Sequence, residues 1–151
     1  MKETIKRQSI VPRLDGIQRD LEKLKSLGEL SLLEFSNEDN FVKAQFYLRR
    51  ALEGVFHIGA HVLSRIPGGR ATEYKEIALR LGEIRIVPKP FAEKNLKAMA
   101  GYRNRLTHFY ADVKPEEIHK IICENLDDFD VFLRAVKELL SNPAKFNLVI
   151  E

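Results

Sequence analysis

Residues 41–66 form the longest amphipathic segment of the chain, and this segment constrains the fold more than any other feature. Apolar residues recur along it at the spacing of one α-helix face. They are Phe41, Leu48, Leu52, Val55, Gly59, Val62 and Ile66, with a second row of Ala44, Tyr47, Ala51 and Ile58 alongside. Two adjacent rows make a wide apolar face, so we expect this helix to contact neighbours on two sides. Its expected start lies at Asn37–Asn40 and its end at Pro67-Gly68-Gly69.

Four other segments have helical patterns. Their expected bounds are Ile10–Gly28, Thr72–Leu81 with Thr72 as the cap and Gly82 as the stop, a helix from Pro90 or Phe91 to about Tyr110, and Pro115–Ser141. We expect Leu30–Asn37 and Ile84–Pro90 to be loops, and only Phe146–Ile150 is a weak candidate for a strand. Short connections favour antiparallel neighbours. The sequence therefore predicts an all-α fold: one domain, residues 1–151, built as a five-helix up-and-down bundle with one short helix.

The composition, 44% hydrophobic and 31% charged, is that of a globular domain. No apolar run approaches the roughly 20 residues that span a bilayer, and the charged start Met1–Gln8 is not followed by the apolar stretch of a secretory signal. Cys123 is the single cysteine, which excludes an internal disulfide framework, and its apolar neighbours predict a buried side chain. We therefore expect a cytoplasmic protein that does not enter membranes. The net charge of +3 permits nucleic-acid binding without requiring it.

The segment Gly101–Tyr110 concentrates side chains that could do chemistry: two arginines, a histidine, an asparagine and two tyrosines. Arginine presents a planar fork of donors that suits a phosphate group, and histidine can transfer protons near neutral pH. Arg103 and His108 are five residues apart, so they diverge by about 140° on a straight helix. They can act together if the backbone breaks between them, or if a second copy of the chain supplies one group. Both arrangements predict a site at a helix junction or a dimer interface.

The run Arg103–Tyr110, with the sequence Arg-Asn-Arg-Leu-Thr-His-Phe-Tyr, resembles the signature of HEPN proteins, in which an arginine and a polar residue precede a histidine. The narrower pattern Arg-x4-His-x-Tyr is similar to that of the HepT toxins of HepT–MntA toxin–antitoxin pairs. The resemblance extends over roughly Ile10 to Leu140. It includes the order of the five helices and the runs Tyr74–Glu76 and Asp127–Phe129.

This resemblance implies a metal-independent endoribonuclease without a cofactor, acting as a homodimer whose paired motifs line one cleft. By position, Arg103 would hold the scissile phosphate, His108 would transfer a proton, and Asn104 would orient the histidine or the phosphate. Attack by the ribose 2′-OH would restrict cleavage to RNA. The family also implies a partner, an MntA-like nucleotidyltransferase antitoxin that attaches AMP to the motif tyrosine, which is Tyr110 here.

Other interpretations of the motif remain open. Arg103 and His108 could bond exposed carbonyl groups at a helix end and complement the helix dipole. Tyr110 could be a half-buried aromatic residue with a bonded hydroxyl. Some HEPN proteins bind RNA or a partner without cutting, so a non-catalytic module that binds a nucleotidyltransferase is the alternative function. A helical bundle that binds a small ligand is a third.

Outside the motif, two groups of residues could bind ligands. His57 and His61 have the spacing of metal ligands, but no third ligand accompanies them, so we expect packing or polar contacts and no metal site. Two groups of basic residues could bind the phosphates of a nucleic acid: Arg49-Arg50, and the group Arg80, Arg85 and Lys89. Because acidic residues are interleaved throughout, we expect solvated helix faces instead.

Overall fold

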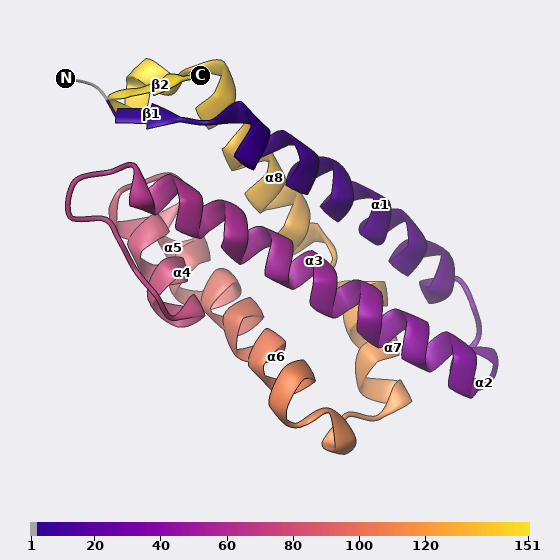
Figure 1. The fold of residues 1–151 in the computed structure, drawn as a ribbon. Helices are drawn as coiled ribbons and strands as arrows, with labels where there is room; N and C mark the ends of the chain where they lie inside the picture. The colour runs from indigo at the N-terminus through magenta and orange to yellow at the C-terminus, as the bar shows by residue number, and fades with distance from the viewer. Residues whose placement is uncertain (1–2) are drawn as a thin grey trace.

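The longest helix, α3 (Glu38–Ser64), runs through the middle of the computed structural model, which describes the backbone of residues 3–151 and the side chains of residues 4–151 (Figure 1). Met1 and Lys2, at the start of the charged N-terminal segment, lie outside the described residues. Asn37 caps α3, since its side-chain oxygen accepts a 2.9 Å hydrogen bond from the Asp39 N–H. Both apolar rows of α3 face the core, so the predicted central helix is confirmed.

The other helices lie on two sides of α3 and behind it (Figure 1). They are α1 (Val11–Gly28), α2 (Leu32–Phe35), α4 (Tyr74–Glu83), α5 (Lys89–Phe91), α6 (Lys97–His108), α7 (Pro115–Glu124) and α8 (Asp127–Ser141). Of these, α1, α2, α4, α6 and α7 contact α3. Short turns extend or join them: the 3₁₀ turns η1 (Arg7–Ser9), η3 (Tyr110–Asp112) and η4 (Pro143–Phe146), and the π-helical turn η2 (Ala92–Leu96). Figure 1 shows α1 beside α3, α4 and α6 on the other side of α3, and α7 and α8 behind. The predicted all-α bundle is confirmed.

The prediction of a loop over Leu30–Asn37 is wrong, because α2 forms there. Ser31 Oγ accepts a 3.2 Å hydrogen bond from the Glu34 N–H, and the Glu34 carboxylate accepts a 3.4 Å bond from the Ser31 N–H. This reciprocal capping box stabilises a single turn, and Phe35 is completely buried beneath it. The Ser-x-x-Glu spacing that signals such a cap is present in the sequence.

The predicted helix Pro115–Ser141 is also wrong, because it is two helices. α7 ends at Glu124, Asn125 leaves the helical conformation with φ −121° and ψ 4°, and α8 begins at Asp127. The acidic first turn of α8 favours a helix start at this point. Asn95 of η2 fixes that start by donating a 3.0 Å hydrogen bond to Asp128. The break lets α7 pack against α1 and α2 independently of the direction of α8.

The bounds of the short third helix differ from the prediction. α4 begins at Tyr74 rather than Thr72, after Glu73, which makes no side-chain cap. Gly82, predicted to stop the helix, lies within it and is buried. A Cβ atom at Gly82 would overlap the Cβ of Ala92, so glycine is required there for the close approach of α4 and η2.

Two three-residue strands join the chain ends. β1 (Glu3–Ile5) pairs in parallel with β2 (Leu148–Ile150), with Ile5 opposite Ile150. The weak strand candidate near the C-terminus therefore becomes a strand, whereas its partner β1 was not predicted. Ile5 and Leu148 are buried at 0% and 2% exposure, so the pair closes one end of the core (Figure 1).

Cys123 is exposed, contrary to the prediction of a buried thiol. The buried face of α7 is formed by Ile118 and Ile122, and the next position along a helix turns away from that face. The Cys123 Sγ lies 3.4 Å from the carbonyl oxygen of Gly28.

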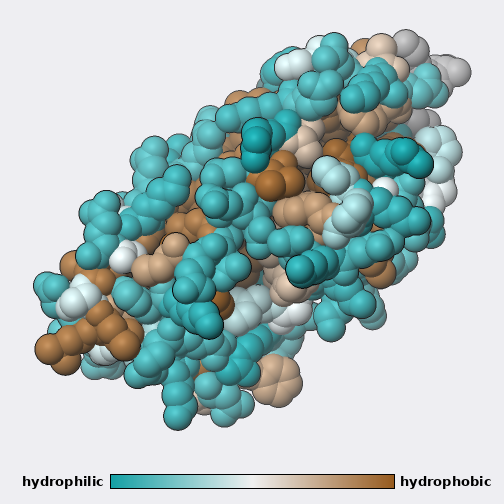
Figure 2. Space-filling model, turned by 180° about the vertical axis from the view of Figure 1, so that it is seen from behind, coloured by the Kyte–Doolittle hydropathy of each residue, from teal (hydrophilic) through white to brown (hydrophobic). Residues whose placement is uncertain are grey.

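The surface is mainly hydrophilic on the back face of the molecule, as Figure 2 shows. A hydrophobic patch lies at the end of the molecule where α2 is found, and Leu32 and Leu33 there are 41% and 86% exposed. Within residues 3–151, no helix has both the length and the apolar character needed to cross a membrane.

We expect Gly82→Ala to lower the free energy of unfolding by about 1–3 kcal/mol, because the added methyl group forces α4 away from η2. Helix propensity alone would favour alanine by about 1 kcal/mol, so the expected sign is opposite to that of propensity. Gly101→Ala is the matched control, since its Cβ would lie 3.6 Å from Lys75 Cε, an ordinary contact. Urea denaturation followed by circular dichroism measures both. A Gly82→Ala protein as stable as the parent would contradict the close approach.

Candidate functional site

The motif Gly101–Tyr110 lies on α6 as far as His108, where the helix ends. Phe109 then leaves the helical conformation, with φ −128° and ψ 29°, and η3 follows. The backbone is therefore unbroken between Arg103 and His108, whose side chains leave the helix about 140° apart. Arg103 and His108 could be brought together by a break in the backbone or by a second copy of the chain. The break does not occur, because α6 is continuous between the two residues.

Arg103 is held by residues of three elements. Its guanidinium carbon lies 4.4 Å from the centre of the Tyr74 ring, and its Nε lies 3.7 Å from Glu53 Oε1. Its Nη1 donates a 3.3 Å hydrogen bond to Asn104 Oδ1. Nε is buried and has no hydrogen-bond partner among the described residues, while the side chain as a whole is 24% exposed. The guanidinium is thus fixed in place with donors left for an anionic group.

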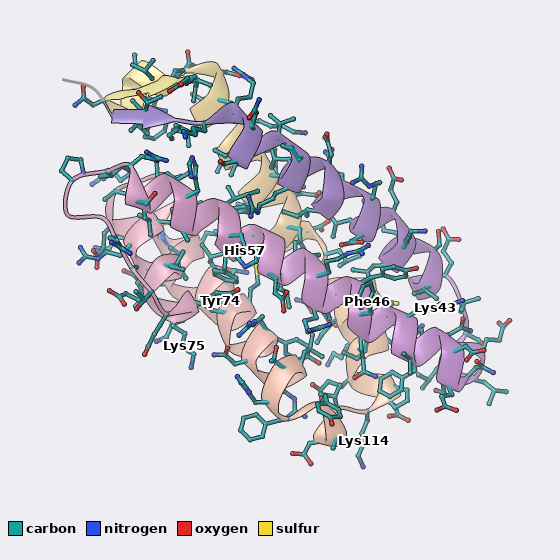
Figure 3. The ribbon with its side chains drawn as sticks, in the orientation of Figure 1. Lys43, Phe46, His57, Tyr74, Lys75 and Lys114 are labelled. Atoms are coloured by element: carbon teal, nitrogen blue, oxygen red, sulfur yellow. The ribbon has the colours of Figure 1, made fainter. Side chains whose placement is uncertain are left out.

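Tyr74, the first residue of α4, forms a platform for Arg103. Its ring also stacks on Phe56, with centroids 4.8 Å apart, and its hydroxyl lies 3.3 Å from His57 Nε2. Figure 3 shows His57 and Tyr74 close together between α3 and α4. Burial raises the pKa of the Tyr74 hydroxyl. Burial is also the main cause that lowers the pKa of His57, and the positive charge of Arg13 is the second. Both groups are therefore uncharged at neutral pH, and their contact is a neutral hydrogen bond.

A cavity of about 460 Å³ opens beside Arg103, between the start of α4 and the middle of α6. It is lined by Thr72, Glu73, Tyr74, Lys75, Arg103 and Asn104. Lys75 is exposed on α4 (Figure 3), and its Cε lies 3.6 Å from the position that a Cβ of Gly101 would occupy. Two positive side chains, Arg103 and Lys75, and one carboxylate, Glu73, therefore line the cavity. The cations supply donors of the kind that bind a phosphate group.

The C-terminal end of the motif is open to solvent. His108 is exposed at the last position of α6, and Phe109 and Tyr110 are 58% and 65% exposed. Tyr110 is thus more accessible than a half-buried aromatic residue. Among the described hydrogen bonds, none joins His108 to Arg103 or Asn104. The structure brings Asn104 to Arg103 and leaves His108 and Tyr110 at the exposed end.

Arg105, the second arginine of the motif, has a structural role. Its Nε and Nη2 each donate a 2.9 Å hydrogen bond to the Glu117 carboxylate, and Nη2 also donates to the Asp112 carbonyl oxygen at 3.3 Å. The Tyr102 hydroxyl donates to the same carboxylate. The hydrogen bonds from Arg105 lower the pKa of Glu117, and burial raises the pKa of Tyr102. This network ties α6 to α7 and holds η3 against them.

The other candidate residues make local polar contacts. His57 contacts Tyr74, and His61 Nε2 accepts a 3.2 Å hydrogen bond from the Lys6 N–H. Within the part of the chain that the structure describes, no three His, Cys, Asp or Glu side chains converge as metal ligands. Several surface cations pair with acidic residues three or four positions along the chain, as expected of solvated faces, whereas Arg50 pairs with the buried Asp20 of α1. The pairs along the chain are Arg49–Glu53, Arg80–Glu83 and Lys89–Glu93, at 3.7, 3.6 and 3.9 Å.

Sequence reasoning assigned no role to Glu53, Tyr74 or Lys75, which the structure places around Arg103. Tyr74 and Lys75 lie in the run Tyr74–Glu76, which carries part of the family resemblance and could have indicated that both residues belong to the site. Glu53 had no such signal, because it comes from a different helix, far along the chain, and approaches Arg103 only through the packing of α3 on α6.

Known proteins are similar in sequence to this chain over most of its length. A family model described as ribonuclease HepT-like matches residues 17–136. The tRNA nuclease HepT of Aphanizomenon flos-aquae is 27% identical over 132 residues, covering 87% of this chain and 89% of that protein. The mRNA nuclease HepT of Shewanella oneidensis is 21% identical over 131 residues, covering 85% of this chain and 96% of that protein.

Solved structures share its fold. A tri-AMPylated HEPN toxin of Shewanella oneidensis, in complex with an MNT antitoxin, superposes with a TM-score of 0.77 at 21% identity. The match covers 87% of this chain and 98% of the toxin. At this level of identity the likeness establishes the fold, and the HEPN-like bundle predicted from the sequence is confirmed.

We expect Glu117→Gln to destabilise the protein in a pH-dependent manner. The folded-state pKa of Glu117 lies below its ordinary value of 4.5, so its stabilising contribution is present above that value and is lost as the pH falls through the folded-state pKa. The difference in unfolding free energy between parent and variant should therefore be largest near neutral pH and vanish in acid. Urea denaturation at a series of pH values measures it, with Glu124→Gln on the same helix as the control. A difference that persists unchanged in acid would contradict the ion pair.

Proposed function

Because this chain belongs to the HepT-like ribonuclease family, we propose that it is the RNA-cleaving toxin of a pair whose antitoxin is a nucleotidyltransferase. Two relatives are named as nucleases of tRNA and mRNA, and the toxin of similar fold is bound to an MNT antitoxin. The observation in this chain that carries the proposal is Arg103, fixed by Tyr74 and Glu53 at the edge of a cavity that also holds Lys75.

The active unit in this proposal is a homodimer. Because α6 is unbroken, Arg103 faces the cavity while His108 stands at the exposed helix end, and one chain does not bring them together. A second copy related by a twofold axis can place its His108 beside the first chain's Arg103, and symmetry then creates the same arrangement twice. The exposed Phe109 and Tyr110 lie beside His108 and would line the same cleft.

Each site residue has a distinct part in the reaction. Arg103 would neutralise the non-bridging oxygens of the scissile phosphate, where negative charge develops. His108 would accept the proton of the ribose 2′-OH or donate one to the departing 5′-oxygen. The 2′-oxygen–phosphorus bond forms while the phosphorus–5′-oxygen bond breaks, which leaves a cyclic phosphate and needs no metal ion. Asn104 would orient Arg103, since Oδ1 already accepts a hydrogen bond from Nη1.

Tyr110 is the proposed site of inactivation by the antitoxin. Its hydroxyl belongs to a ring that is 65% exposed, two residues after His108, so a nucleotidyltransferase could reach it. Attachment of AMP would place a bulky anion at the rim of the cleft and repel the substrate phosphate.

One observation favours the alternative of a non-catalytic module that binds a nucleotidyltransferase. Arg103 is already engaged by Glu53 and Asn104, and a phosphate would have to compete with the nearby carboxylate for the guanidinium. The cleavage experiment separates the two functions.

The purified protein is expected to cleave RNA in the presence of EDTA, and His108→Ala should lose activity by about 10²–10⁴-fold because proton transfer is removed. Circular dichroism should show an unchanged helix content for the variant. Arg134→Ala, an exposed change on α8, is the control. Full cleavage by His108→Ala, or no effect of Arg103→Ala on any activity, would support the non-catalytic alternative.

Mixing the inactive Arg103→Ala and His108→Ala proteins tests the shared cleft. A heterodimer has one cleft with both groups intact, so random exchange of subunits should restore roughly a quarter of the parent activity. No recovery after verified exchange, or a monomer by light scattering, would contradict the composite site.

Co-expression with the nucleotidyltransferase encoded by a neighbouring gene is expected to increase the mass of Tyr110 by one or more AMP groups. Mass spectrometry of the digested protein locates the change. Tyr102→Phe is the matched control in the same motif and should still be modified, whereas Tyr110→Phe should not. AMP found on another residue of the Tyr110→Phe protein would exclude Tyr110 as the specific target.

A further inference from the structure

A second concave surface lies between α1 and α3, and the proposed reaction does not use it. This α1–α3 hollow has a volume of about 470 Å³, in the range of ligand-binding sites. We define it by Arg13, Gly16 and Arg19 from α1 and by Arg50, Gly54 and His57 from α3. The two glycines contribute no side chains. A Cβ at Gly54 would lie 2.9 Å from Ile17 Cγ1, so glycine there also lets α1 and α3 approach closely.

Arg50 is locked in position within the hollow. Asp20, only 1% exposed, accepts hydrogen bonds from Arg50 Nε at 2.9 Å and from Nη2 at 2.6 Å. The guanidinium carbon also lies 4.7 Å from the centre of the Phe46 ring. Two of the five N–H donors are occupied by Asp20, and three remain available on a side chain that is 54% exposed. A buried carboxylate thus holds the guanidinium rigidly while its outer edge faces solvent.

Arg13 and Arg19 add two further positive charges. Neither forms an ion pair within the described side chains. Arg13 Nη1 donates a 3.0 Å hydrogen bond to the Ser9 carbonyl oxygen, which leaves its charge uncompensated. Arg19 Nη2 lies 3.9 Å from the position that a Cβ of Gly16 would occupy, so its guanidinium bends over the glycine. The hollow therefore carries more positive than negative charge.

The hollow adjoins the Arg103 site through a wall of side chains. Glu53 lines the hollow and its Oε1 lies 3.7 Å from Arg103 Nε. His57 lines it too, and its Nε2 meets the hydroxyl of Tyr74, the platform for Arg103. Figure 3 labels Phe46 and His57, which lie before and after Arg50 and Glu53 along α3, and shows Tyr74 just beyond. An extended ligand could thus contact both sites.

We infer that the α1–α3 hollow binds a backbone phosphate of the RNA strand, next to the phosphate held at Arg103. The inference rests on the proposed function and adds to it a second contact with the substrate. Three guanidinium groups in a groove suit the repeated charges of a strand, because arginine binds phosphate oxygens through parallel N–H donors. The exposed ring of Phe46 beside Arg50 offers a surface on which a base can stack.

RNA binding by the full-length His108→Ala protein tests this inference without cleavage of the probe, a fluorescein-labelled single-stranded RNA. In this background, Arg13→Ala/Arg19→Ala should weaken binding by about 10-fold. The slope of log affinity against log salt should fall by about 0.7, the value for one lost phosphate contact on a single strand. Both arginines are exposed on α1, and alanine is the best helix former, so the variant should fold.

Two further variants distinguish a built site from general surface charge. Arg50→Lys keeps the positive charge but loses the planar fork, and it should also weaken binding. Arg134→Ala/Lys137→Ala removes two exposed positive charges from α8, outside the hollow, and should retain the affinity and salt slope of its parent. Equal affinities and slopes for the α1 and α8 double variants would overturn the inference.

Competition experiments distinguish other ligands of the hollow. Displacement of the RNA by inorganic phosphate or AMP at low millimolar concentration, lost in Arg13→Ala/Arg19→Ala, would assign the hollow to a free anion and overturn the assignment to a strand. Unchanged RNA affinity with lost binding of the nucleotidyltransferase would assign it to the partner, with the same consequence.

Failure of the inference and failure of the proposed function give different results. With His108 intact, Arg13→Ala/Arg19→Ala should raise KM while kcat is retained, because the lost contact binds substrate and transition state alike. If the Arg13→Ala/Arg19→Ala protein cleaves RNA with an unchanged KM, RNA binding in the α1–α3 hollow is contradicted while the proposed function stands. A folded parent protein that neither cuts nor binds RNA would remove the proposed function and the inference together.

Discussion

The burial of α3 is the constraint on which the rest of the structure depends. Two adjacent apolar rows on one long helix cannot be covered by a single neighbour, so α1 packs on one side and α4 and α6 on another. Each fully buried leucine, isoleucine, valine or phenylalanine contributes about 1.5–3 kcal/mol. Glycines bring the neighbours close, since a Cβ at Gly59 would lie 2.9 Å from Ile77 Cγ2.

This buried helix also supplies the polar groups around the candidate site. Glu53 and His57 are four residues apart and therefore share one face of α3, between the packed residues Leu52 and Ile58. Because their helix is fixed by its core contacts, Glu53 meets Arg103 and His57 meets Tyr74 at defined positions. Preorganisation of this kind favours phosphate binding, since the cations need little rearrangement when a ligand arrives.

The straight helix α6, by contrast, keeps two residues of the motif apart. A continuous helix separates Arg103 from His108 by its own geometry, and the Arg105–Glu117 ion pair holds η3 and the helix end in place. The same chain thus has a fixed arginine, Arg103, and an exposed histidine, His108, whose side chains point in different directions. Twofold symmetry is the simplest operation that joins them, which is why we propose a dimer as the functional unit.

Much of the fold could be predicted because helices are local structures. The spacing of apolar residues in the sequence predicted α1, α3 and α6, and Asn37 and Pro115 marked helix starts correctly. Regular periodicity hid the break at Asn125, since both helices keep an apolar face towards the core. The pairing of β1 with β2 joins opposite ends of the chain, and the three residues of β1 carry too little local pattern to be recognised, whereas β2 lies within the predicted strand candidate.

The residues of the candidate site also fall into those that the sequence predicts and those that only packing between helices brings together. The sequence by itself determined the motif residues Arg103, Asn104, His108 and Tyr110, the family, and the angle that separates arginine from histidine. Only the tertiary structure decided that α6 stays unbroken, that Glu53 and Tyr74 surround Arg103, and that Asp20 locks Arg50 beside Arg13 and Arg19 of α1. The physical reason is that helical geometry depends on neighbouring residues, whereas contacts between helices depend on how distant side chains pack.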